Sequence, residues 1–439
     1  MGSLNRLSAT AAAWKLAARE ITAVSLLRDC LERIAEREPT VRAWTFVDAD
    51  AAMQRARVLD SQASAGLLHG LPIAVKDLFD TFDMPTCYGS PIYANHRPAA
   101  DAACVTLARA AGAIVVGKTV TTEFATFHPG PTCNPRNPMH TPGGSSSGSA
   151  AAVADYMVPL AFGSQTAGSI VRPAAFCGVV GYKPTYGTIN RVGVKMISDT
   201  LDTIGALARS VPDAALFVAA LSDRRELLIQ RPLVGAPRVG LCRTYEWDRA
   251  RPETIAAFED AARSLSLAGA SVRDIALPAQ FAHLVDAQIA IMVREVAKSL
   301  SHEWHVHREG LSGEMIAMIE AGLAVSSERY DAARILARTS RAALADVFED
   351  IDVVLAPSTV GEAPAGIQAT GDPLFNRMWT LLHTPCVHLP SGLGPRGLPV
   401  GVTIAGPIGA ERATLLAADW IHARIGRWDA ELDSTKGDR

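Results

Sequence analysis

Cysteine is sparse in this chain and shows no metal-binding or redox spacing. The 439 residues include seven cysteines, and no two of them stand in a CxxC arrangement. An odd and scattered set of this kind favours reduced thiols over a disulfide framework. We therefore expect a cytoplasmic location.

Long apolar runs and a strong net charge are also missing. No stretch of about eighteen uninterrupted apolar residues is present to span a bilayer. The segment from Trp14 to Glu38 is amphipathic and rich in charge, unlike a signal peptide. The formal net charge is -3, and no basic run interleaved with aromatic residues occurs. These absences predict no nucleic acid and no membrane as partners.

One segment suggests a metal site, because His302, His305 and His307 stand close together. Residues 302 and 305 share a helix face, but the spacing is not that of H-E-x-x-H, and no cluster of cysteines or carboxylates accompanies them. We interpret the segment as a surface helix end. The sequence predicts no metal and no organic cofactor.

Glycine and serine are concentrated in mid-chain. Residues 143–149 read GGSSSGS and run directly into an Ala-Val stretch, and residues 163–169 form a second loop, GSQTAGS. Glycine lets backbone N–H groups converge, which is the arrangement that an oxyanion needs. A flexible linker is the simple alternative for the first loop. Linkers usually lie where composition changes, however, and here the following residues are those of a buried core.

The first loop also matches the nucleophile elbow G-x-S-x-G, with Ser146 at its centre. That motif requires a strand before it and a helix after it. Residues 133–142 contain three prolines, which argues against a central strand. The elbow stays open as the weaker alternative.

A third feature is the apolar run of residues 71–75, which ends in Lys76. A serine hydroxyl is a weak nucleophile until a base takes its proton. Lysine can be that base if burial lowers its pKa, since desolvation disfavours the charged form. A lysine after a strand is usually solvated, and a serine in a glycine-rich loop usually caps a helix. The combination of two serine loops with this lysine, however, is typical of a Ser-Ser-Lys hydrolase.

These segments together resemble the amidase signature family. The matching stretches are VKD at 75–77, GGSSSGSAAAVA at 143–154 and GSQTAGSIVRPAAFCGVVGYKPTYG at 163–187. The resemblance covers nearly the whole chain and is weakest at about 228–350. It implies one domain over residues 1–439, with α/β/α layers, a large mixed sheet and a more variable, mainly helical region at 228–350.

The family also implies roles for the reacting groups. Ser169 would be the nucleophile, Lys76 the base, and Ser145, preceded by a cis peptide bond, the proton bridge between them. The backbone N–H groups of three loop residues would form the oxyanion hole: Thr166, Ala167 and Gly168. Alanine at 167 departs from the usual glycine but still supplies an N–H group.

Arg172 is the candidate for substrate binding. The order Ser-x-x-Arg-Pro is closest to that of bacterial malonamidase-like amidases, whereas many members carry arginine one place earlier. If Ile170 opens a helical turn, Ser169 and Arg172 lie on one face. A guanidinium there would suit a carboxylate. The alternative is a structural arginine that is paired with a core carboxylate.

The predicted function is hydrolysis of a linear C–N amide bond of a small molecule through a seryl acyl-enzyme. Three alternatives remain. The same triad can cleave a carbamate, an ester or a urea-type bond. The chain can be an amidotransferase-type subunit, which works with partner subunits and transfer RNA, or a binding protein without activity. A homodimer is a candidate assembly.

Alternation of strands and helices predicts an α/β fold with helices on both faces of the sheet. We expect strands at 71–75, 113–118, 239–242, 272–277 and 353–356. We expect helices at 21–36, 102–111, 149–154, 280–307, 313–321 and 327–348, and one that begins at Pro252.

Overall fold

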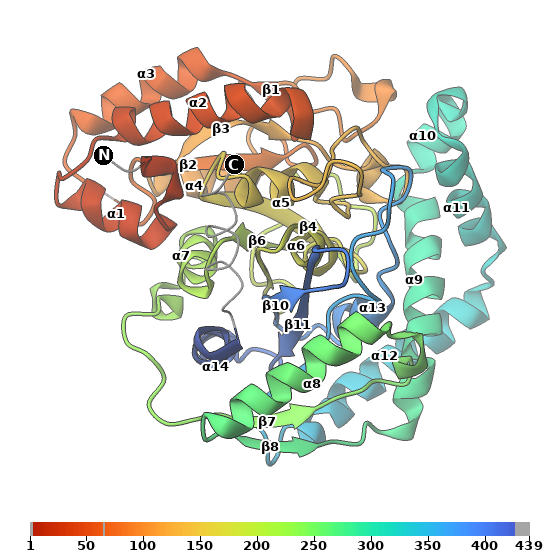
Figure 1. Ribbon diagram of the computed structural model, residues 1–439. Helices are drawn as coiled ribbons and strands as arrows, with labels where there is room; N and C mark the ends of the chain where they lie inside the picture. The colour runs from red at the N-terminus through yellow and green to blue at the C-terminus, as the bar shows by residue number, and fades with distance from the viewer. Residues whose placement is uncertain (1–2, 65, 426–439) are drawn as a thin grey trace.

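A mixed sheet of 11 strands forms the centre of the protein in the computed structural model, which describes residues 3–64 and 66–425 (Figure 1). The strand order is β1-β3-β2-β4-β6-β5-β10-β11-β9-β7-β8. β2 is parallel to β3 and β4, and β7 is parallel to β8 and β9, while the other neighbours are antiparallel. The strands are β1 Trp44–Val47, β2 Pro72–Lys76, β3 Ile114–Thr119, β4 Leu160–Gln165, β5 Val180–Lys183, β6 Thr203–Ala208, β7 Arg238–Leu241, β8 Ser271–Asp274, β9 Val353–Pro357, β10 Cys386–Leu393 and β11 Pro399–Ala405.

Helices surround this sheet, as the α/β prediction requires. Several begin where a hydroxyl side chain accepts a hydrogen bond from the first turn, as Thr22, Ser312 and Ser326 do. The α-helices of the described residues are α1 Ala9–Ala17, α2 Ala23–Val41, α3 Ala49–Asp60, α4 Ala103–Ala110, α5 Ser147–Ala154, α6 Val171–Cys177, α7 Val211–Ser222, α8 Pro252–Leu267, α9 Leu284–Ser299, α10 Ser301–Val306, α11 Gly313–Ala324, α12 Ser327–Val347, α13 Leu374–Leu381 and α14 Glu411–Ile425. No helix of the described part is long and apolar enough to cross a membrane.

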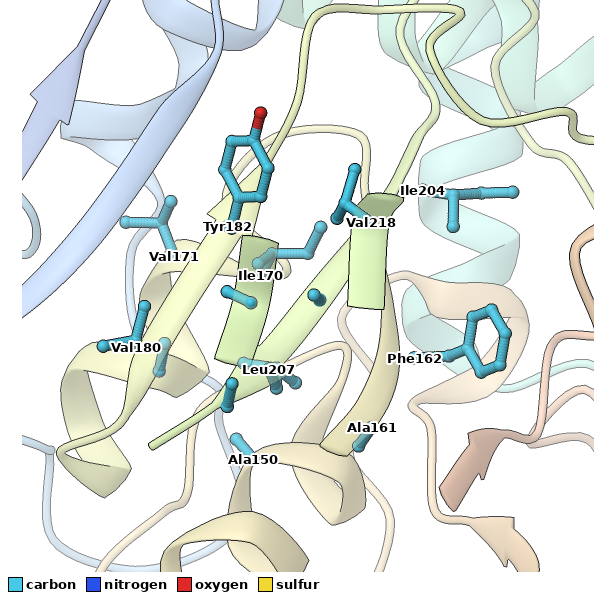
Figure 2. Close-up of a cluster of buried hydrophobic side chains, with 14 of the residues drawn as sticks. Ala150, Ala161, Phe162, Ile170, Val171, Val180, Tyr182, Ile204, Leu207 and Val218 are labelled. Atoms are coloured by element: carbon cyan, nitrogen blue, oxygen red, sulfur yellow. The ribbon is translucent and has the colours of Figure 1, made fainter. Parts of the chain in front are cut away.

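Neighbouring residues of β4 show how the sheet separates two layers, because successive side chains of a strand point to opposite faces. Phe162 packs against Phe217 of α7, with ring centroids 4.8 Å apart. Gly163 faces the other side, where the nearest side-chain atoms to it belong to Ile170 and Ser146. The close-up in Figure 2 shows Phe162, Ile170 and other members of this core. The two serine loops therefore lie on the face opposite α7.

Glycines in the strands let the second serine loop lie directly on the sheet. A Cβ atom at Gly181 of β5 would come within 2.6 Å of the Ala174 Cβ and 3.0 Å of the Ile170 carbonyl oxygen. At Gly205 of β6 a Cβ would meet the Ile170 side chain at 2.9 Å. Because these positions lack side chains, α6 and the residue before it approach the strands closely.

α5, which follows the first serine loop, is buried on every side. All eight of its residues, 147–154, are buried. Its small residues allow this, since a Cβ at Gly148 would come within 2.1 Å of the Ala43 carbonyl oxygen. A linker is solvated, so the linker interpretation of residues 143–149 is wrong.

The predicted helix at 280–307 is the main local error in the secondary structure. The segment divides into a 3₁₀ turn, Ala279–His283, followed by α9 and α10. The two helices separate at Leu300, where the backbone leaves helical angles (φ -98°, ψ 24°) while the side chain stays buried. Apolar periodicity continues through this kink, so the sequence pattern does not reveal it. α9, α10, α11 and α12 lie beside one another along one side of the molecule (Figure 1).

We expect Gly181→Ala to lower the midpoint of thermal unfolding. The added methyl group has no space beside Ala174 and Ile170, and overpacking of a core costs about 1–3 kcal/mol. Gly313→Ala is the matched control, because a Cβ there meets nothing within 4 Å. Equal midpoints for the two variants would show that the close approach of α6 does not constrain the sheet.

Candidate active site

Lys76 is the last residue of β2, and its side chain is fully buried. Its Nζ atom lies 2.8 Å from the Ser145 Oγ and 2.8 Å from the Ser164 Oγ. β2 lies between β3 and β4 in the sheet. The amine at its end therefore contacts one serine from each of the two serine-rich motifs. The structure thus brings Lys76 and Ser145 into contact, although 69 residues separate them.

The surroundings of this amine favour its neutral form. Burial lowers the pKa of Lys76 from 10.5 to about 7, and the charge of Asp202 opposes that shift only in part. A neutral amine has two N–H donors and one lone pair. It can donate to Ser164 while it accepts the Ser145 hydroxyl proton, so both contacts are satisfied without a positive charge.

Ser145 is fully buried and follows a cis peptide bond after Gly144. The carbonyl oxygens on each side of it are both held. The Gly144 oxygen accepts a hydrogen bond from Arg172 Nη2 at 2.8 Å, and the Ser145 oxygen accepts one from the Thr122 N–H at 3.3 Å. The cis bond is the one that the family resemblance implies.

Ser146 does not occupy a nucleophile elbow. It precedes α5 directly, and a loop without a strand precedes it. Its hydroxyl forms hydrogen bonds with the backbone of Ser164, at 3.4 Å from both the nitrogen and the oxygen. The nucleophile-elbow interpretation is therefore wrong, because that motif requires a strand before the serine.

Ser169 lies in the second serine loop, two residues before α6 begins at Val171. Its carbonyl oxygen accepts a hydrogen bond from the Ser146 N–H at 3.3 Å, which joins the two loops. The side chain borders a small cavity. The other residues that line this cavity are Ala125, Thr126, Phe127, Thr166, Ala167, Arg172, Ile197, Met292 and Met318.

The loop between β4 and Ser169 contains the three residues of the predicted oxyanion hole. Thr166 is anchored because its hydroxyl donates to Asp202 Oδ1 at 2.5 Å. The other oxygen of Asp202 accepts from the N–H groups of Ile197 and Ser198, and burial raises the pKa of this carboxyl to about 6. In the described part of the chain, the N–H groups of Ala167 and Gly168 have no backbone or side-chain acceptor. They are free to donate to an oxyanion.

Arg172 is buried on α6. Nη2 donates to the Gly144 oxygen and, at 3.1 Å, to Thr370 Oγ1, while Nε and Nη1 have no hydrogen-bond partner among the residues that the structure describes. Burial, together with the charge of Arg377, lowers the pKa of the guanidinium to about 9. Among residues 3–64 and 66–425, no carboxylate forms an ion pair with Arg172. The alternative of a core ion pair is wrong, although the bond to Gly144 gives this arginine a structural role as well.

Sequence reasoning missed Ser164, the second partner of Lys76. It lies within the same GSQTAGS motif, on β4, so the motif itself was the available signal. Asp77 follows Lys76 but belongs elsewhere, because its Oδ1 lies 3.1 Å from Lys118 Nζ.

The histidines at 302–307 do not form a metal centre. His302 packs edge-on against His307 at 5.2 Å between ring centroids, while the buried Glu303 binds the Lys195 amine at 2.5 Å. No group of three or more His, Cys, Asp or Glu side chains in the described ranges could hold a metal ion.

Comparison with known proteins shows the family of this chain. The Amidase family matches residues 25–415. A glutamyl-tRNA(Gln) amidotransferase subunit of Mycobacterium ulcerans is 34% identical, over 93% of this chain and 95% of the relative. A crystal structure of an amidase superposes with a TM-score of 0.88 at 30% identity, covering 96% of this chain and 100% of the other. The peptide amidase of Stenotrophomonas maltophilia gives a TM-score of 0.80 at 29% identity, with 96% and 97% covered. The chain belongs to the amidase signature family.

Proposed function

We propose that this amidase signature hydrolase cleaves a linear amide through a seryl acyl-enzyme, with Ser169 as nucleophile, Ser145 as proton bridge and Lys76 as base. The observation that carries the proposal is the buried Lys76 amine, which lies 2.8 Å from the Ser145 hydroxyl and whose pKa burial lowers to about 7. A lysine becomes a useful base near neutral pH only when its pKa is lowered in this way.

The proposed reaction begins when Ser169 Oγ attacks the amide carbonyl carbon. The Ser169 proton passes to Ser145, and the Ser145 proton passes to the Lys76 amine. The carbonyl oxygen becomes an oxyanion, to which the N–H groups of Thr166, Ala167 and Gly168 donate. Ser145 then gives a proton to the leaving nitrogen, Lys76 returns its proton to Ser145, and water hydrolyses the acyl-enzyme.

The residues that line the cavity beside Ser169 favour a small substrate with an anionic group. The apolar part of this cavity includes Phe127, Met292 and Met318, and Arg172 is the one cationic side chain among the described residues that line it. The unpaired Nε and Nη1 atoms of Arg172 are suited to a carboxylate, since hydrogen bonds to charged groups are the strongest. We therefore propose a small half-amide of a dicarboxylic acid as the first substrate, in line with the malonamidase-like Ser-x-x-Arg-Pro order.

An amidotransferase-type subunit is the second candidate function. The 34% sequence identity to the glutamyl-tRNA(Gln) amidotransferase subunit, over 93% of this chain, favours this candidate. The two functions differ in what the purified chain does alone. Release of ammonia from a panel of small amides, without any added protein, supports the amidase. Turnover that requires a co-purified partner subunit supports the amidotransferase. Carbamates and esters in the same panel test the remaining bond types.

We expect Ser169→Ala to lower the turnover number by about four to six orders of magnitude while the fold is retained, because the nucleophile is lost. A fluorophosphonate probe, which reacts with activated serines, should label Ser169 in the unmodified chain. Mass spectrometry of the labelled peptide identifies the site. Ser146→Ala is the matched control and should keep the label. A label on Ser146 instead would contradict the assignment.

The rate of acylation should rise with pH through about 7 and level off above it. The pKa of Lys76 is lowered to about 7, so the neutral amine predominates only on the alkaline side. Lys76→Arg should be nearly inactive at every pH tested, because arginine keeps its proton. A metal chelator should leave the rate unchanged. Full inhibition by the chelator with recovery on adding zinc would overturn this mechanism.

Arg172→Ala should raise KM for carboxylate-bearing amides far more than for neutral amides. Loss of a hydrogen bond to a charged group costs about 1.5–3 kcal/mol, so the expected difference is about 10- to 100-fold. Steady-state kinetics on a matched pair of amides, with and without the carboxylate, measures it. An equal loss on both substrates, together with a lower unfolding temperature, would assign Arg172 to the support of Gly144 alone.

A further inference from the structure

Two side chains from distant parts of the chain donate hydrogen bonds to backbone carbonyls of the loop before Ser169. Gln288 Nε2 of α9 donates to the Thr166 oxygen at 2.9 Å. Thr380 Oγ1 of α13 donates to the Ala167 oxygen at 2.8 Å. Both side chains are fully buried. Each bond therefore forms in a place where water cannot replace it.

These two bonds determine where the next N–H groups point. Both peptides are trans, and in a planar trans peptide the C=O and the following N–H point in opposite directions. The Thr166 oxygen points toward Gln288, so the Ala167 N–H points away from it. The Ala167 oxygen points toward Thr380, so the Gly168 N–H points away from that hydroxyl. These are two of the N–H groups to which we assign the oxyanion.

The direction of the Gln288 bond is itself fixed by a neighbour. Arg377 Nη1 donates to Gln288 Oε1 at 2.5 Å. A guanidinium cannot accept a hydrogen bond, so the amide oxygen must face Arg377. The amide NH₂ group is then left for the Thr166 oxygen.

The Thr380 bond is oriented in a similar way. Gln165 Oε1 accepts from the N–H groups of Ile170 and Val171, at 2.9 and 3.0 Å. Its NH₂ group must therefore donate, and it donates to Thr380 Oγ1 at 2.9 Å. The single hydroxyl proton of Thr380 is left for the Ala167 oxygen. Donors and acceptors match along the whole chain of contacts.

We propose that Gln288 and Thr380 are positioning residues of the oxyanion hole, which act by holding the Thr166 and Ala167 carbonyls away from the substrate. The proposal rests on the function proposed above. Without these donors a buried carbonyl oxygen loses its partner, and rotation of the peptide to find another would turn the N–H away from the oxyanion. The effect would be on acylation, since the N–H groups act where charge develops.

The test measures the rate at which a fluorophosphonate probe labels Ser169 in Gln288→Met and Thr380→Val. Each variant keeps the approximate shape of the side chain and removes the donor. Removal of a whole oxyanion donor costs about 100- to 1000-fold, so misdirection of one should slow labelling about 10- to 100-fold. The pH at which labelling is half-maximal should stay unchanged, because Lys76 is not touched. With a substrate from the amide panel, kcat should fall while KM changes little.

Two conservative variants separate this role from a structural one. Thr380→Ser keeps the hydroxyl and should label at close to the original rate. Gln288→Glu keeps an acceptor for Arg377 but offers only oxygens to the Thr166 carbonyl, so it should be as slow as Gln288→Met. If Gln288→Glu labels normally, only the contact with Arg377 matters and the proposal is wrong.

The remaining outcomes are also distinguishable. Normal labelling of Gln288→Met and Thr380→Val would overturn the positioning role and leave the proposed function standing. A shifted pH midpoint would place the effect on the lysine and would likewise overturn it. Absence of labelling in the unmodified chain would instead contradict the proposed function, on which the positioning role depends.

Discussion

The arrangement of this site depends on the burial of the Lys76 amine without a contacting carboxylate. Lys76 and Lys118 are equally buried on the neighbouring strands β2 and β3, and burial lowers the pKa of both. Lys118 lies 3.1 Å from a carboxylate oxygen of Asp77, whereas Lys76 contacts two serine hydroxyls. Hydroxyls can donate or accept, so they suit an amine that gains and loses a proton. A carboxylate instead favours the charged form of the amine.

Such a site requires the loops to approach the sheet more closely than ordinary side chains allow. The strands supply the space with glycines, of which Gly163, Gly181 and Gly205 all face Ile170. α5 supplies it with serine, glycine and alanine, which let the helix be buried on every side. The small residues that make the sequence look like a linker are therefore a packing requirement. The same residues that suggest flexibility permit a densely packed interior.

This explains what the sequence could and could not predict. Lys76, Ser145 and Ser169 stand in contiguous motifs, so the sequence could identify them as candidate site residues. The α/β layers follow from alternating strand and helix patterns, so the fold class could be predicted as well. Gln288 and Thr380 lie 122 and 213 residues from the carbonyls that they bind. Glutamine and threonine are common in helices, and no local pattern marks one that reaches another segment. The kink at Leu300 was missed because the apolar spacing on both sides of it remains helical.

α9 contributes both to the cavity beside Ser169 and to the support of the loop that precedes Ser169. Met292 lines the cavity, and Gln288, one turn earlier, binds the loop that precedes the nucleophile. Residues four apart lie on the same helix face, so a shift of α9 moves both. A side chain of another size at Met292 would thus change the cavity from the same helix face that carries Gln288. Under the positioning role proposed above, α9 is constrained by the chemistry at Gln288. Under that role, a change of α9 that reshapes the cavity has to keep the 2.9 Å bond between Gln288 and the Thr166 oxygen.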